Sequence, residues 1–422
     1  MREKLLNFYN QSFILSRSFI VVSASLFSSI FAYLFQVISA RYLSIEEYSE
    51  LVALFSLSVV INTIMLVFTN GTTKLVAEIK NVNYPDRISN FFFSLIKMVT
   101  LTTLLILIVM IATPNFIARY LNIQNTGLIF VFIIAIAVGN FNVVFGPMLQ
   151  GLQRFKAFSF YTFVNSFSKF IVALAVMYLG LNVIHTFVGL IISTIFSIII
   201  GAILLKKNII LKLKSFDKED ISTLLKYSLG SILILASLNF LQNNDIIFVK
   251  HYFDSNLAGI YASLTVIGKI IFFAASPVAI VMLPICAERY KHGGDVIKPF
   301  VVSLLIATFI SACGTIIYWA FPHLIITMLF GEKYLSAEPY LPAYGFFMLI
   351  YTLIYIIGMF LIAISKFKLG SLMLVGIIIQ ATGIALYHNS LMQVINVSIF
   401  AGIITLIILG SILIPVLKPV KV

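Results

Sequence analysis

The sequence predicts an all-α membrane protein, with about twelve transmembrane helices in two related six-helix lobes around a central cavity. Three observations support this fold class: an extreme apolar composition, apolar runs of membrane-spanning length, and a weak internal repeat. Of the 422 residues, 61% are hydrophobic and only 10% are charged, with a mean hydropathy of +1.09. A soluble domain has about 45–50% apolar and roughly 25% charged residues. The chain is therefore predicted to cross a membrane many times.

The apolar runs have the length that a bilayer requires. Its hydrocarbon core needs about 20 consecutive apolar residues per helix. Polar breaks separate twelve such runs, at residues 18–40, 48–69, 91–112, 128–149, 159–180, 186–205, 227–249, 257–283, 300–320, 343–364, 369–387 and 392–414.

The basic residues predict the orientation of these spans. Cytoplasmic loops of membrane proteins carry an excess of Lys and Arg. With the N-terminus inside, most of the 28 Lys and Arg residues fall in inner segments, and only Arg41, Arg119, Lys250 and Lys333 fall in outer ones. Both termini are therefore predicted to be cytoplasmic. The net charge of +13 is explained by topology, and nucleic acid is not an expected partner.

An internal repeat divides the chain into two halves. Ser49 aligns with Gly259, and the run Leu149–Lys156 aligns with Leu361–Lys368. Because an even number of spans separates the matches, the repeat is parallel, and such repeats place the substrate path between the halves. We expect a first lobe at 1–205, a cytoplasmic linker at 206–223 and a second lobe at 224–422. The basic linker is either an amphipathic surface segment or a solvated tether.

Four charged residues in or near the spans are candidate functional residues, because a charge within a bilayer is costly. Lys269 lies near the middle of its span, and Asp245 lies in the preceding one. We interpret Lys269 as part of the substrate path and Asp245 as an ion-coupling group, at depths that make a direct ion pair doubtful. Lys169 either serves the path or pairs within the first lobe. Arg17 is close enough to a span end to reach the surface, or to meet an anionic headgroup.

Uncharged polar residues in the same spans extend the candidate path. In the seventh span, Asn239, Gln242 and Asn243 follow a spacing of three and four residues, which places them on one helix face. Asn62 and Gln36 lie in the first two spans. The alternative for these residues is hydrogen bonding between helices, worth about 1 kcal/mol per pair or less.

No motif of a soluble enzyme is present: the sequence lacks a P-loop, a G-x-S-x-G and an H-E-x-x-H. The two cysteines, Cys286 and Cys313, do not have metal-ligand spacing. We therefore expect no cofactor, no metal and no enzymatic activity. Transport would draw its energy from a gradient, because the chain has no sequence for hydrolysing ATP.

Several segments resemble the bacterial polysaccharide (oligosaccharide-lipid) flippases of the multidrug/oligosaccharidyl-lipid/polysaccharide exporter superfamily. They are 40–49 after the first span and 149–155 after the fourth, then 244–245, 252–254 and 259–261 around the turn between the seventh and eighth, and 329–334 after the ninth. The turn at Tyr252–Asp254 departs from the family in lacking a glycine. Twelve spans, rather than fourteen, argue against the related lipid II flippases.

The resemblance implies alternating access in the bacterial cytoplasmic membrane. The expected substrate is an undecaprenyl-diphosphate-linked oligosaccharide repeat unit for O-antigen or capsule, moved from the inner to the outer leaflet. Membrane lipids are expected partners, and a glycan polymerase is a candidate one. A multidrug/cation antiporter of the same fold is the alternative, although it would need more acidic groups than Asp245 alone. A membrane polysaccharide polymerase or ligase is a third hypothesis, which the short outer loops disfavour.

Overall fold

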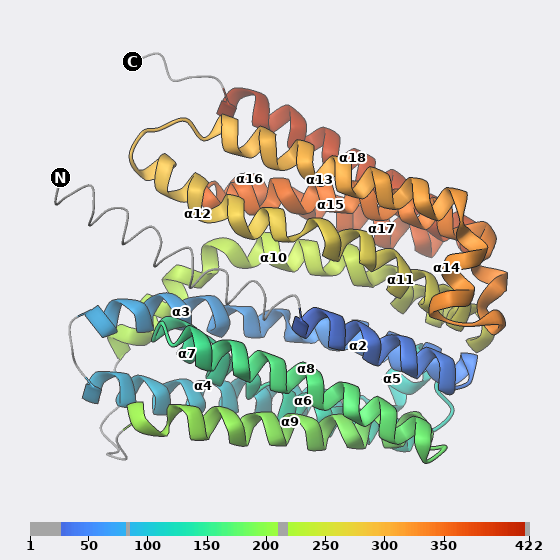
Figure 1. Ribbon diagram of the computed structural model, residues 1–422, viewed down its shortest axis with the longest axis horizontal. Coiled ribbons are helices and arrows are strands. Elements are labelled where there is room, and N and C mark those ends of the chain that lie inside the picture. Colours follow the sequence, from blue (N-terminus) through green and yellow to red (C-terminus); the bar gives the residue numbers. More distant parts are fainter. Residues whose placement is uncertain (1–26, 82–84, 210–217, 418–422) are drawn as a thin grey trace. The chain divides into compact units, whose positions relative to one another are not determined.

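The computed structural model describes residues 27–81, 85–209 and 218–417 (Figure 1). Within these residues the regular secondary structure is entirely helical. Eleven helical segments of the described part are long and apolar enough to cross a membrane. The first predicted span, 18–40, is described only from residue 27, where a helix runs to residue 42. The predicted class of a multi-pass, all-α membrane protein is confirmed.

The helices form two compact units that interleave along the chain. Unit 1 comprises Met1–Tyr42, Ile64–Asn115 and Asn125–Ser228, and unit 2 comprises Leu43–Thr63, Phe116–Gln124 and Leu229–Val422. Two segments of the predicted first lobe thus pack with unit 2. The lobe boundaries at 205 and 224 stay a prediction.

Unit 1 is built from helices that pack both on chain neighbours and on helices farther along the sequence. Here α8 packs on α9, α3 on α7, and α6 on α9. After the helix at 27–42, its elements are α3 (Leu66–Asn81), α4 (Pro85–Ala112), α6 (Thr126–Gly139), α7 (Asn142–Gly151), α8 (Phe155–Tyr178), α9 (Val183–Leu205), η2 (Lys206–Asn208) and the start of α10 (Lys218–Tyr252).

Unit 2 is organised around α15 (Leu341–Ala363), which packs on α11, α12, α13 and α18. This helix is apolar on every side, as expected of a helix enclosed by others. The other elements are α2 (Ile45–Asn62), α5 (Pro114–Tyr120), the rest of α10, α11 (Ser255–Ala275), α12 (Pro277–Lys291), α13 (Ile297–Ala320), α14 (Pro322–Leu329), η3 (Glu332–Tyr340), α16 (Phe367–Gly370), α17 (Met373–Leu386) and α18 (Leu391–Leu417). A short 3₁₀ turn, η1 (Thr63–Met65), joins α2 to α3.

Matched turns make the internal repeat visible in the backbone. Gln153, after α7, and Ser365, after α15, both adopt the left-handed conformation, with φ of 56° and 57°. Ser44 and Asp254, which the repeat aligns, are the N-caps of α2 and α11. Each accepts a hydrogen bond from a backbone N–H of its first turn, which satisfies a donor that the helix leaves open. The repeat therefore fixes how equivalent helices begin and end.

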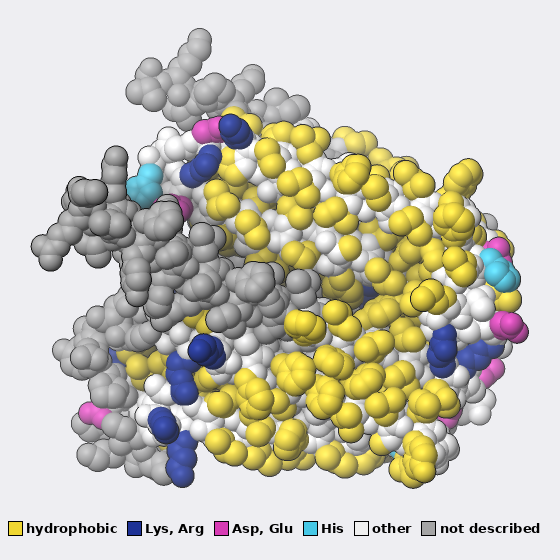
Figure 2. All heavy atoms as spheres, viewed as in Figure 1, with side chains coloured by type: hydrophobic (Ala, Val, Ile, Leu, Met, Phe, Trp, Pro, Cys, Tyr) yellow, Lys and Arg dark blue, Asp and Glu magenta, His cyan; other side chains and the backbone are white. Residues whose placement is uncertain are grey.

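The surface has the character of a protein embedded in lipid. Large apolar side chains stand exposed along whole helices, for example Ile108 on α4, Phe309 on α13 and Ile407 on α18. Hydrophobic side chains cover the middle of the face seen in Figure 2, and Lys and Arg gather near the helix ends. Exposed apolar surface of this extent is unusual for a soluble monomer.

Candidate functional site

The candidate site lies within unit 2, where α10 and α11 carry the charged residues that the sequence places inside the membrane. Asp245, on α10, is fully buried. Its Oδ2 accepts hydrogen bonds from the hydroxyls of Tyr261 on α11 and Tyr344 on α15, at 2.9 and 3.0 Å. Its Oδ1 accepts the backbone N–H of Ile246 at 2.9 Å. Three donors therefore replace the water that a carboxylate would otherwise bind.

Lys269, on α11, begins a separate chain of polar contacts. Its Nζ donates to Oδ1 of Asn243 at 2.9 Å. The Asn243 amide in turn donates to the backbone carbonyl of Asn239 at 2.9 Å, and the Asn239 amide lies 3.4 Å from the Thr63 hydroxyl. Because Nδ2 of Asn243 is engaged by a carbonyl, its oxygen is the atom presented to the lysine.

Lys269 and Asp245, both within the described residues, form no ion pair with each other. Lys269 is half-buried, and its described partner is a neutral amide oxygen. Because an ammonium has three N–H groups, Lys269 has donors left for another acceptor.

Three further predicted residues carry polar atoms that have no hydrogen-bond partner among the described residues. These are Oδ1 of Asn62, Oε1 of Gln36 and Nε2 of Gln242, all buried atoms on half-buried residues. Asn62, at the end of α2, and Gln242, on α10, belong to unit 2, whereas Gln36 belongs to unit 1. Buried polar atoms are paired in the great majority of cases, so unpaired ones are candidates for contact with water or a ligand.

The remaining predicted cations are not brought to this site. Lys169 lies on α8 in unit 1 and is half-buried, with neither a hydrogen bond nor an ion pair to any residue that the structure describes. Polar side chains precede it on its own helix: Tyr161 donates to Oδ1 of Asn142 at 2.8 Å, and Asn165 lies 3.5 Å from the same atom. Arg17 lies outside the described residues.

Three functional groups were missed from the sequence. Tyr261 and Tyr344 lie in apolar helices, and their positions in the sequence do not indicate that they bind the Asp245 carboxylate. The third is Lys250, whose burial the sequence does not indicate. It lies in the last turn of α10, which is the predicted outer end of that span, and is fully buried. A hydroxyl at Ser49 and another at Ser255 take the place of solvent around its ammonium.

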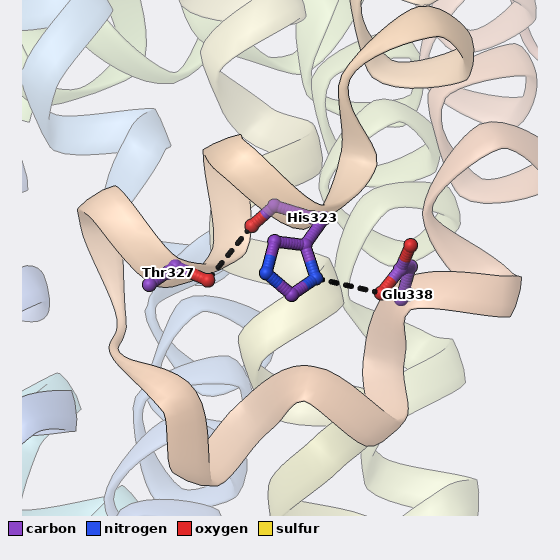
Figure 3. A network of polar contacts seen from close by, with 3 residues as sticks. All are labelled: His323, Thr327 and Glu338. Carbon is purple, nitrogen blue, oxygen red and sulfur yellow. Dashed lines mark hydrogen bonds and ion pairs between the residues drawn. The ribbon is translucent and has the colours of Figure 1, made fainter.

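A further polar group lies on α14 and η3, apart from the residues around Asp245, Lys269 and Lys250. The His323 ring and Glu338 are 3.2 Å apart, and the Thr327 hydroxyl donates to the His323 carbonyl at 2.9 Å (Figure 3). Both members of the pair are exposed, so it contributes little to stability. Among the described residues, no group of three or more His, Cys, Asp or Glu side chains could hold a metal.

Solved structures identify the class of protein to which this fold belongs. An inward-facing multidrug resistance MATE family transporter of the MOP superfamily superposes with a TM-score of 0.75 and 14% identity, over 96% of this chain and 99% of that one. The lipid II flippase MurJ, in an inward closed conformation, superposes with a TM-score of 0.71 and 15% identity, over 94% of this chain and 87% of that one. A MOP superfamily transporter from Pyrococcus furiosus superposes with a TM-score of 0.62 and 13% identity, over 96% of each chain. The chain thus has the fold of MOP superfamily transporters.

The sequence narrows this class to a family. Residues 14–289 match the family described as polysaccharide biosynthesis protein, and the chain belongs to that family. No sequence among the curated proteins matches it. The family resemblance drawn from the sequence is confirmed.

Proposed function

We propose that this protein is a flippase that moves undecaprenyl-diphosphate-linked oligosaccharide repeat units from the inner to the outer leaflet by alternating access. The observation that carries the proposal is the state of Lys269. Its ammonium lies inside a membrane-spanning helix and is held by an amide oxygen, and no carboxylate of the described residues forms an ion pair with it. A diphosphate entering a low-dielectric path needs such a compensating charge. Membership of the polysaccharide biosynthesis family supports the oligosaccharide part of the substrate.

Other polar residues extend this path in the proposal. Asn239, Gln242 and Asn243 line it from α10, and Asn62 contributes an unpaired amide oxygen. Gln36, Lys169 and Arg17 complete the path from the first half of the chain. Neutral amides suit a sugar, because they donate and accept hydrogen bonds without adding charge.

Asp245 is proposed to couple transport to an ion gradient, by taking up and releasing a proton. Its carboxylate is held by two tyrosine hydroxyls, which can rearrange when the carboxyl becomes a donor itself. In proteoliposomes, Asp245→Asn should make the rate of flipping independent of pH, while Tyr261→Phe should keep the pH dependence. A pH profile unchanged by Asp245→Asn would assign the residue a structural role only.

The proposed setting is the bacterial cytoplasmic membrane, with both termini in the cytoplasm. The two lobes, 1–205 and 224–422, would be joined by a cytoplasmic linker at 206–223. Membrane lipids and a glycan polymerase are the proposed partners, with O-antigen or capsule as the product. Reporter fusions at each terminus test the orientation directly.

The flippase proposal is tested by deleting the gene. The deletion should leave a lipid-linked oligosaccharide on the inner leaflet, where mass spectrometry identifies its sugars and diphosphate. Arrival of that lipid at the outer face at the normal rate would refute the proposal. In a matched assay, purified protein should flip a polyprenyl-diphosphate sugar but not the same lipid with an uncharged linkage.

A multidrug/cation antiporter remains the second candidate. Asp245, a buried carboxylate within a membrane-spanning helix, favours it, as does the similarity to MATE family transporters over nearly the whole chain. This function predicts drug resistance on overexpression, lost in Asp245→Asn. The flippase proposal predicts no change in resistance for either protein.

A further inference from the structure

Lys250 is a buried charge that the proposed transport path does not use. It lies in the last turn of α10, with none of its surface exposed. Its Nζ donates to Oγ of Ser49 on α2 at 2.8 Å and to Oγ of Ser255 at the start of α11 at 2.7 Å. One ammonium thus joins the ends of three helices.

The carboxylates near Lys250 do not pair with it. Asp254 caps α11 by accepting the backbone N–H groups of Asn256 and Leu257. Glu46 is exposed and lies 3.4 Å from the Asn256 amide. Glu50 is half-buried one helical position beyond Ser49. Within the described part of the chain, the hydrogen-bond acceptors of the Lys250 ammonium are therefore two hydroxyls. The three carboxylates attract its charge without contacting it, and this attraction is weaker than the cost of burying the ammonium.

Close packing of α2 on α11 opposes this cost. At Gly259 the helices approach so closely that a methyl group would collide with the carbonyl oxygen of Ile45. Next to this contact, the Tyr48 ring packs edge-on against Phe330 and Tyr334, with centroids 5.9 Å away in each case. We call the contact between α2 and α11 the α2–α11 seam.

The course of α2 supplies a hinge for this seam. The segment Ile45–Ile79 is one membrane span, yet α2 belongs to unit 2 and α3 to unit 1. The 3₁₀ turn at Thr63–Met65 separates them, and a 3₁₀ stretch within a longer helix often marks a hinge. A movement of α2 away from α11 can therefore be absorbed without unwinding either helix.

Alternating access, as proposed above, requires the outer end to open to water, and we propose that Lys250 is the positioning residue that poises the α2–α11 seam to open there. When the seam is closed, apolar packing outweighs the cost of the buried ammonium. When it opens, hydration of Lys250 offsets the lost packing. The proposal rests on the flippase function, because transport gives the seam a reason to open.

A crosslink across the seam tests whether it opens. After Cys286→Ala and Cys313→Ala, the pair Glu46→Cys and Asn256→Cys is oxidised in membranes. Crosslinked protein should lose transport, and reduction should restore it. The control pair is His323→Cys with Glu338→Cys, whose native side chains are 3.2 Å apart on α14 and η3 (Figure 3). Its crosslink should leave transport intact. Unchanged transport by the crosslinked seam pair would overturn the proposal.

A second variant isolates the role of Lys250. Ala53, one turn beyond Ser49 on α2, is fully buried, so Ala53→Cys reports opening through its reaction with a membrane-impermeant maleimide. Lys250→Met removes the charge at similar length and should slow this reaction about tenfold, because the closed seam no longer buries a charge. A lysine that merely holds the fold together would give the opposite result, faster labelling in Lys250→Met, and this would overturn the proposal.

The labelling reaction needs no transport. If Lys250→Met slows the labelling of Ala53→Cys in a protein that flips no lipid, the flippase proposal fails and the proposed role of Lys250 at the seam is supported. If the flippase assay succeeds while labelling is insensitive to Lys250, the seam proposal alone fails.

Discussion

Lys169 in unit 1 and Lys269 in unit 2 are both lysines in the middle of a membrane-spanning helix, and both are half-buried. Their surroundings differ. The ammonium of Lys269 is held by Asn243, which the Asn239 carbonyl holds in turn. Lys169 has an asparagine four residues before it, but that side chain is directed to Asn142 on α7, and no described residue bonds the lysine.

The ammonium of Lys269 is therefore a fixed charge, because a hydrogen bond holds it in one direction. That of Lys169 is an adjustable charge, because no described residue holds it. Binding a substrate to Lys269 costs little ordering, because its side chain is already held in one direction. Binding to Lys169 must first immobilise a long side chain, which costs about 0.5–1.5 kcal/mol. If both lysines meet the substrate, we expect Lys269 to determine affinity and Lys169 to follow the moving headgroup.

The largest expected effect comes from removing the fixed charge. Lys269→Ala should reduce flipping about 10- to 100-fold, the range expected for losing a charge-assisted hydrogen bond worth about 1.5–3 kcal/mol. Lys269→Arg keeps the charge and should retain most activity. Initial rates in proteoliposomes at equal protein content measure both. Equal rates for Ala, Arg and wild type would remove Lys269 from the path.

A smaller loss of flipping is expected when the Lys269 ammonium is kept but its hydrogen bond to Asn243 is removed. Asn243→Ala leaves Lys269 free to reorient, and should lower flipping about fivefold, as for the loss of one hydrogen bond of about 1 kcal/mol. The loss should appear mainly as weaker substrate affinity. Ser237→Ala, elsewhere on α10, removes a hydroxyl that bonds only its own helix backbone and serves as the control.

The smallest effect is expected at the adjustable lysine. Lys169→Ala should reduce flipping about two- to threefold, because a mobile side chain gains less from each contact. A loss as large as that of Lys269→Ala would show that the two lysines are equivalent, and would remove the contrast between the units. Thermal unfolding of each variant checks that the fold is kept.

The sequence predicts the spans well, and it identifies a functional residue where a charged side chain interrupts an apolar run. Apolar runs predict the spans, and the repeat predicts matched turns such as those at Gln153 and Ser365. A carboxylate at Asp245 is conspicuous because its surroundings are apolar. Its partners are not, because a tyrosine such as Tyr344 is common in apolar helices and its bond to Asp245 spans 99 residues of sequence. The burial of Lys250 was not predicted, because a charge near a span end usually reaches water, whereas packing of α2 covers this one.

The hydrogen bond between Ser49 and Lys250 joins residues 201 positions apart in the chain. A ribosome adds about 5–20 residues per second, so α2 enters the membrane roughly 10–40 s before its partner helix exists. During that interval Glu50 and Ser49 face lipid or a temporary partner. Synthesis of this protein therefore includes a waiting period for α2, and a membrane insertase or chaperone that shields its polar side in that period would raise the yield of folded protein.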